Sequence, residues 1–83
     1  MTNTEIVIYG TTWCWDCKRA RQFMDKHNIL YKYIDIDRDE TGEMFVLETN
    51  NGMRSVPTII FNDGSILVEP STKALAEKLG IIY

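Results

Sequence analysis

The stretch that decides the fold is Glu5-Ile6-Val7-Ile8-Tyr9-Gly10-Thr11-Thr12-Trp13-Cys14-Trp15-Asp16-Cys17. Its first part, Glu5–Tyr9, is dominated by β-branched and aromatic side chains, which is typical of a strand buried on both faces. A Gly-Thr-Thr segment ends this run, and two cysteines with the spacing C-x-x-C follow. Less polar residues then recur at helical spacing, at Cys17, Ala20, Phe23, Met24 and His27. The stretch therefore predicts a strand, a short connection, and an amphipathic helix that starts near Cys14 and ends near Asn28.

The next part of the chain predicts a second strand and a second helix. Leu30–Ile36 has strand character, and a helix between two strands places them parallel in one sheet. The pattern Asp37-x-x-Glu40 resembles a capping box that starts a helix. We expect the apolar face of this helix to hold Met44, Phe45 and Leu47, and its end to lie at Asn50-Asn51-Gly52.

The last third of the chain predicts a hairpin and a final helix. Thr58–Phe61 and Ile66–Val68 are short strands, and Asp63-Gly64 between them is a strong hairpin signal. Ser71 is the expected N-cap of a helix that ends at Gly80. The order β-α-β-α-β-β-α predicts an α/β domain over residues 1–83, in which a four-stranded mixed sheet carries helices on both faces.

Composition and charge narrow the function classes. The 83 residues are 45% hydrophobic and 25% charged, which indicates one globular domain. A net charge of -3 argues against nucleic-acid binding, which usually needs a basic surface. The first residues, Met1–Glu5, lack an export signal, and no apolar run reaches the roughly 20 residues of a membrane span. We therefore expect a cytoplasmic protein without membrane partners, in which a C-x-x-C pair indicates redox or metal chemistry.

The position of the cysteine pair at the start of a helix predicts a different chemical role for each cysteine. Unpaired N–H groups at a helix N-terminus stabilise a thiolate, so Cys14 is the expected nucleophile. Cys17 falls one turn inside on the apolar face, and it is the expected buried resolving thiol. Lys18 is expected to favour the Cys14 thiolate by its charge, whereas the Asp16 carboxylate opposes it.

Two other uses of the pair are weaker. A structural zinc site usually has four ligands, and His27 is the one further soft ligand, so we expect no metal. A structural disulfide across so short a loop would stabilise the fold little.

A second feature, Val56-Pro57-Thr58, precedes the third strand, where the X-Pro bond is either cis in a tight turn or trans at the start of an edge strand.

These residues together resemble the glutaredoxin branch of the thioredoxin superfamily, and most closely the mycoredoxin-type bacterial glutaredoxins. The matching segments are Tyr9–Cys17, Asn51–Thr58, Asp63-Gly64-Ser65 and Pro70-Ser71. The resemblance implies a thioredoxin-like fold with a cis Pro57 beside Cys14. It also implies that Val56 offers its backbone to a substrate as an added strand, and that Thr12, Trp13 and Arg54 line the substrate groove. We expect the exposed Trp15 to contribute to the same surface.

The resemblance predicts a dithiol oxidoreductase that reduces protein disulfides or mixed disulfides with a low-molecular-weight thiol, glutathione or mycothiol, and that binds no resident cofactor. Two features depart from the glutathione-using pattern: Trp15-Asp16 between the cysteines, and Leu67–Ser71 in place of a Gly-Gly turn followed by acidic residues. An electron donor fed by thioredoxin reductase, for example to ribonucleotide reductase, and an iron–sulfur cluster module remain alternatives. We expect a monomer.

Overall fold

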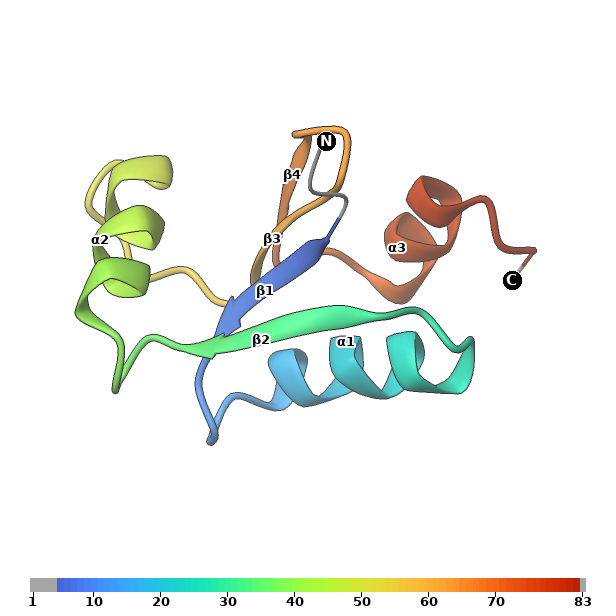
Figure 1. The fold of residues 1–83 in the computed structure, drawn as a ribbon, viewed down its shortest axis with the longest axis horizontal. Coiled ribbons are helices and arrows are strands. Elements are labelled where there is room, and N and C mark those ends of the chain that lie inside the picture. The colour runs from blue at the N-terminus through green and yellow to red at the C-terminus, as the bar shows by residue number, and fades with distance from the viewer. Residues whose placement is uncertain (1–4, 83) are drawn as a thin grey trace.

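The computed structural model describes residues 5–82, and its elements follow the predicted order (Figure 1). They are β1 (Ile6–Gly10), α1 (Trp15–Lys26), β2 (Tyr31–Asp35), α2 (Glu40–Thr49), β3 (Thr58–Ile60), β4 (Ile66–Val68) and α3 (Thr72–Leu79). Two predictions reach residues outside the described range: the domain over 1–83, and the lack of an export signal at Met1–Glu5. None of the described helices is long and apolar enough to cross a membrane.

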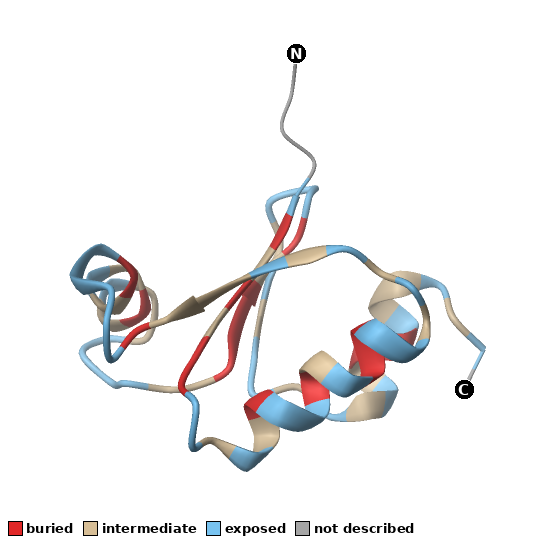
Figure 2. Ribbon diagram, turned by 60° about the horizontal axis from the view of Figure 1, so that its bottom comes forward, coloured by how far each residue is buried: buried red, intermediate tan, exposed pale blue. Residues whose placement is uncertain are grey.

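The sheet has the strand order β2-β1-β3-β4. β1 runs parallel to β2, with Ile8 opposite Tyr33, whereas β3 runs antiparallel to both β1 and β4. Helices α1 and α3 lie together on one side of the strands, and α2 lies on the other (Figure 2). The predicted four-stranded mixed sheet with helices on both faces is thereby confirmed.

The main core lies between the sheet and the α1–α3 layer. It is formed by side chains from β1, from β3 and the residue after it, and from both helices, namely Ile6, Ile8, Ala20, Phe23, Met24, Ile59, Phe61, Leu75 and Ala76. The helical spacing of the apolar residues in α1 explains why this helix turns one face to the sheet. The core holds β1 in the centre, and the C-terminal end of β1 leads directly to the cysteine pair.

Helix α2 corrects two of the predictions. Its N-cap is Asp39, whose side chain accepts a hydrogen bond from the Gly42 N–H at 2.9 Å, and not Asp37. The chain is still turning at Asp37, whose N–H donates to the Asp35 carboxylate at 3.0 Å. The buried residues of α2 are Gly42 and Val46, whereas Met44, which we expected on the apolar face, is 55% exposed. A helix that packs on one face of a sheet buries only a narrow stripe of its side chains, so apolar residues outside that stripe stay exposed.

Gly42 allows this helix to pack closely. A Cβ atom at this position would lie 2.7 Å from the Ile34 side chain, which is far inside ordinary contact. The glycine that weakens the helix by its low propensity therefore permits the approach of α2 to β2. On the same side of the sheet, the rings of Tyr9 and Phe45 stack with centroids 4.6 Å apart.

The remaining boundaries differ from the predictions by one or two residues, and the predicted caps are confirmed. Ser71 accepts a hydrogen bond from the Ala74 N–H at 3.0 Å, and Gly80 ends α3 in the left-handed conformation. In the hairpin, the Phe61 N–H donates to Ser65 at 2.8 Å. These features depend on hydrogen bonds between close neighbours in the chain, which is why the sequence reveals them.

Candidate active site

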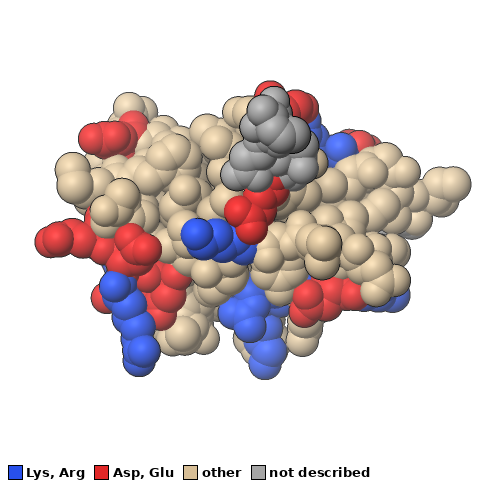
Figure 3. Space-filling view, viewed as in Figure 1, with Lys and Arg blue, Asp and Glu red and all other residues tan. Residues whose placement is uncertain are grey.

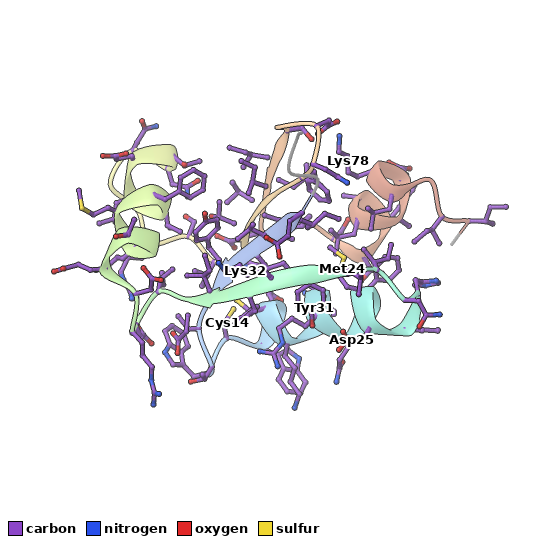
Figure 4. The ribbon with its side chains drawn as sticks, in the orientation of Figure 1. Cys14, Met24, Asp25, Tyr31, Lys32 and Lys78 are labelled. Carbon is purple, nitrogen blue, oxygen red and sulfur yellow. The ribbon has the colours of Figure 1, made fainter. Side chains whose placement is uncertain are left out.

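The two cysteines lie at the junction of β1 and α1, and no disulfide joins them. Figure 4 shows Cys14 at this junction. Cys14 is the N-cap of α1, and its sulfur accepts a hydrogen bond from the Cys17 N–H at 3.1 Å. Cys14 is half-buried, whereas Cys17 has no exposed surface. A sulfur in the N-cap position lies where the first turn of the helix offers free N–H groups.

Cys17 lies in a setting that keeps it protonated. Burial, reinforced by the neighbouring Cys14 sulfur, raises the pKa of Cys17 to about 12. The two thiols of the pair thus differ in the way that nucleophile and resolving thiol should differ: one reaches solvent from a helix end, and the other is enclosed and holds its proton.

The Val56–Pro57 turn lies next to Cys14. The Val56–Pro57 peptide bond is cis, and Pro57 is buried. The Cys14 thiol points to the Val56 carbonyl oxygen, with sulfur and oxygen 3.8 Å apart. On its other side the turn contacts the chain after β4, because the Glu69 N–H donates to the Pro57 carbonyl at 2.8 Å. The segment Leu67–Ser71 therefore lies against the turn that faces Cys14.

The predicted groove residues Trp13 and Arg54 meet at Asp37, a carboxylate that the sequence analysis proposed only as a helix cap. The Trp13 indole N–H donates to Asp37 at 2.9 Å. The Arg54 guanidinium donates to Asp37 at 2.6 Å and to Glu43 at 2.7 Å. Hydrogen bonds from Arg54 and then from Trp13 lower the pKa of Asp37. Trp13 nevertheless remains 68% exposed, so its indole edge is held while its ring faces solvent.

The other predicted groove and tuning residues surround the start of α1. Trp15 is 72% exposed, and the Lys18 ammonium lies 5.3 Å from the centre of its ring. Asp16 pairs with Arg19 one turn along the helix. Thr12 is exposed, whereas its neighbour Thr11 is buried. The charges that we expected to act on Cys14 thus have partners of their own on the first turns of α1.

Acidic side chains gather beside this site, where β2 ends and α2 begins (Figure 3). They come from one short stretch of sequence, and they are Asp35, Asp37, Asp39, Glu40 and Glu43. The sequence could have indicated that these carboxylates lie near the cysteines, because the C-terminal ends of the parallel strands β1 and β2 meet at the same edge of the sheet. Within residues 5–82, no group of three or more His, Cys, Asp or Glu side chains is arranged to hold a metal ion. The His27 ring packs against the Phe23 ring at a tilt of 51°, with ring centroids 4.5 Å apart.

Tyr33 and Gly10 also lie at the site, although the sequence analysis predicted only a strand around Tyr33 and no role for it in the site. The Tyr33 hydroxyl donates to the Thr11 carbonyl at 2.7 Å. A Cβ atom on Gly10 would lie 2.4 Å from this hydroxyl and 2.7 Å from the Cys17 sulfur. Side chains alternate between the two faces along β2, so Tyr33 lies on the same face of the strand as Tyr31. This alternation is the feature of the sequence that bears on the position of Tyr33.

Fold and site together define a class: a thioredoxin-like protein with a dithiol at the start of its first helix and a cis-proline opposite. Comparison with known proteins refines this class. A sequence profile of the glutaredoxin family matches residues 6–66. A relative from Mycobacterium tuberculosis, assigned to the glutaredoxins by its name, is 37% identical over 79 residues, which cover 95% of this chain and 94% of the relative. Mycoredoxin 1 from Corynebacterium glutamicum is 32% identical over 76 residues, covering 92% and 94%.

Solved structures agree. The glutaredoxin from Methanosarcina mazei Go1 superposes with a TM-score of 0.76 at 27% identity, covering 94% of this chain and 80% of that one. A mutant of a thioredoxin-like protein, at 23% identity, has the same fold with a TM-score of 0.82, covering 94% and 97%. This chain belongs to the glutaredoxin family, and it is a thiol–disulfide oxidoreductase.

Proposed function

We propose that the protein reduces mixed disulfides between proteins and a low-molecular-weight thiol by a dithiol mechanism, with Cys14 as nucleophile and Cys17 as resolving thiol. The observation that supports this most is the unequal pair. Cys14 is half-buried at the N-cap of α1 and accepts a hydrogen bond from the Cys17 N–H at 3.1 Å, whereas Cys17 is fully enclosed.

In the first step, the Cys14 thiolate attacks one sulfur of the substrate disulfide. A bond forms between Cys14 and that sulfur, the substrate S–S bond breaks, and the leaving thiolate takes up a proton from solvent. The thiol of Cys14, which contacts the Val56 carbonyl at 3.8 Å in the reduced protein, must leave this contact first. The carbonyl is then free to accept a hydrogen bond from an extended substrate segment, as β-augmentation requires.

In the second step, Cys17 attacks the Cys14 sulfur. Its S–H bond breaks, the Cys14–Cys17 disulfide forms, and the bound group leaves as a thiol after taking up a proton. Two electrons have then passed from the dithiol to the substrate. A reductant from the cell, either the same low-molecular-weight thiol or a reductase, must return them. We place this cycle in the cytoplasm, with a monomeric protein.

The exposed rings of Trp13 and Trp15 provide the surface for the bound group. They lie on either side of Cys14 in the sequence, and exposed aromatic rings are favoured contacts in binding surfaces. The hydrogen bond from Trp13 to Asp37 orients one of them. Together with Thr12 and the Val56–Pro57 turn, these rings form the groove in our proposal.

The charges around this groove favour mycothiol over glutathione. Glutathione carries two carboxylates, whereas mycothiol carries mainly sugar hydroxyls. Arg54, the cation that we place in the groove, is already paired with Asp37 and Glu43. A glutathione carboxylate would have to displace one of these anions within an acidic surface (Figure 3). The similarity to mycoredoxin 1 supports the same choice.

The test uses the Cys17→Ser variant, which cannot resolve an adduct. We would mix it with disulfides that join glutathione, mycothiol or coenzyme A to one reporter peptide, and then weigh the intact protein. The proposal predicts that mycothiol adds to Cys14 most rapidly, and that Cys14→Ser gains no adduct. A Glu43→Gln variant, in which Arg54 loses one of its two anions, should accept glutathione faster than its parent.

Each outcome is informative. Equal rates for all disulfides would refute the mycothiol preference and leave the dithiol mechanism in place. If no adduct formed on Cys17→Ser, the low-molecular-weight-thiol proposal would fail. Reduction of the oxidised protein by thioredoxin reductase would then favour the electron-donor alternative.

A further inference from the structure

Beneath the cysteine pair lies a cluster, buried at Cys17 and Gly10 and half-buried at Tyr33, to which the two-step mechanism assigns no tyrosine. It brings together the Cys17 sulfur, the Tyr33 hydroxyl and the backbone of Gly10. Both the sulfur and the hydroxyl lie within 3 Å of the point where a Gly10 Cβ atom would be. Glycine at this position therefore leaves the space in which a tyrosine from β2 reaches the resolving thiol at the start of α1.

Two contacts hold Tyr33 in this place. Its hydroxyl donates to the Thr11 carbonyl at 2.7 Å, in the connection between β1 and α1. The Arg21 guanidinium of α1 lies 4.4 Å from the centre of its ring. A guanidinium over an aromatic face is attracted by the ring quadrupole, so the side chain is fixed at both its hydroxyl end and its ring.

The buried thiol presents a chemical problem that such a group can solve. Cys17 must lose its proton to attack Cys14, yet enclosed surroundings disfavour a thiolate. A neutral phenol can stabilise the forming anion by donating a hydrogen bond to it. Tyr33 has the one O–H donor needed, and a short rotation about its C–O bond would redirect it from the Thr11 carbonyl to the sulfur.

We propose that Tyr33 is a further catalytic residue of the resolving step, held in place by Arg21 as a positioning residue, and that its hydroxyl donates a hydrogen bond to the sulfur of Cys17 as the thiolate forms. This inference rests on the proposed role of Cys17 as the resolving thiol. The atom balance of the step is unchanged: the Cys17 proton passes to solvent, the Cys14–Cys17 bond forms, and the bound group leaves and is protonated. Tyr33 keeps its own proton throughout.

The charged and titratable groups around the cluster agree with this role. The Thr11 backbone and the Tyr33 hydroxyl both lower the pKa of Cys17, against the larger opposing effects of burial and of Cys14. Burial raises the pKa of Tyr33 above its ordinary value, so the phenol stays a donor. Arg21 also faces Tyr31, whose hydroxyl donates to Asp25 at 3.0 Å (Figure 4).

The experiment follows both thiols in one stopped-flow trace. Reduced protein is mixed with 5,5′-dithiobis(2-nitrobenzoate), and the released coloured thiolate is recorded. Attack by Cys14 releases the first equivalent, and resolution by Cys17 releases the second. For Tyr33→Phe we expect the second phase to slow by about tenfold while the first stays within twofold, because a hydrogen bond to a charged acceptor is lost. The pH profile of the second phase should move upward by about one unit.

Tyr9→Phe is the matched control, because it also removes one tyrosine hydroxyl from the sheet, but on the side that packs against Phe45. Its second phase should match that of the wild type. Arg21→Met, which removes the charge over the Tyr33 ring, should slow the second phase by about threefold. If circular dichroism shows that Tyr33→Phe does not fold, Arg21→Met takes its place, and the same threefold slowing of the second phase is required.

A slowing of threefold or more that is confined to the second phase supports the inference. A smaller effect, or an equal slowing of both phases, overturns it. Failure of the proposed function has a different signature: the wild type would show no second phase that Cys17→Ser abolishes, and the role of Tyr33 would be rejected with it.

Discussion

Replacing Gly10 by alanine tests how tightly the structure couples the end of β1 to Cys17. The added Cβ would lie 2.4 Å from the Tyr33 hydroxyl and 2.7 Å from the Cys17 sulfur. The hydroxyl would need to retreat by about 1 Å, and the sulfur by somewhat less, to reach ordinary contact at roughly 3.5 Å. The central strand itself has little freedom to yield, because β1 pairs with β2 on one side and β3 on the other.

The expected loss of stability has two parts. Inserting a methyl group into a well-packed site costs about 1–3 kcal/mol. Moving the hydroxyl stretches its 2.7 Å hydrogen bond to Thr11, which costs about 1 kcal/mol more. The free energy of unfolding should therefore fall by roughly 2–4 kcal/mol, which lowers the Tm by about 8–32 °C in a domain of this size.

Urea unfolding followed by circular dichroism measures this loss, and a double-mutant cycle identifies its source. In Gly10→Ala/Tyr33→Phe, the phenylalanine removes the nearest clashing atom. The loss for the double variant should therefore be smaller than the sum of the two single losses, by about 1 kcal/mol or more. Gly42→Ala, which meets the Ile34 side chain at 2.7 Å on the other side of the sheet, is the matched control for overpacking.

Two results would refute the reasoning. The first is a Gly10→Ala protein as stable as the wild type, since the clash would then be absent in solution. The second is strict additivity in the double variant, which would show that the methyl group and the hydroxyl do not compete for the same space. Resolution by Cys17 should also slow in Gly10→Ala and not in Gly42→Ala.

Three further predictions concern other parts of the molecule. The reduced protein should lose stability as the pH rises from 9.0 toward about 12, because the unfolded chain releases the Cys17 proton while the folded chain keeps it. In urea titrations, the free energy of unfolding should decline less steeply with pH for Cys17→Ala than for the wild type. Parallel curves would contradict the raised pKa of Cys17. In a Trp15→Phe background, Trp13 fluorescence should titrate with a midpoint below 3.8, the ordinary Asp37 value, and Asp37→Asn should abolish the transition. Removing the α3 cap with Ser71→Ala should cost about 1 kcal/mol, and an unchanged Tm would argue against the cap.

Much of the fold was predictable because its signals are local. The Ser71 cap, the Gly80 terminus and the Asp63-Gly64 turn each depend on hydrogen bonds between residues a few positions apart. The second helix shows where local reading fails. Asp37 and Asp39 are both acceptable caps by residue type, and the choice of Asp39 follows from where β2 ends and the chain turns.

Some features of the site were likewise predictable from the sequence, whereas others depend on the tertiary structure. The sequence by itself determined that a C-x-x-C pair begins a helix after a buried strand, and from this follows the prediction that Cys14 is the nucleophile and Cys17 the resolving thiol. Contacts between distant residues were decided only by the tertiary structure, which brings Asp37 and Glu43 to Arg54, Val56 to Cys14, and Tyr33 to Cys17. The physical reason is that helix phase and strand alternation set which face a side chain occupies, whereas sheet order and helix packing set what it meets there.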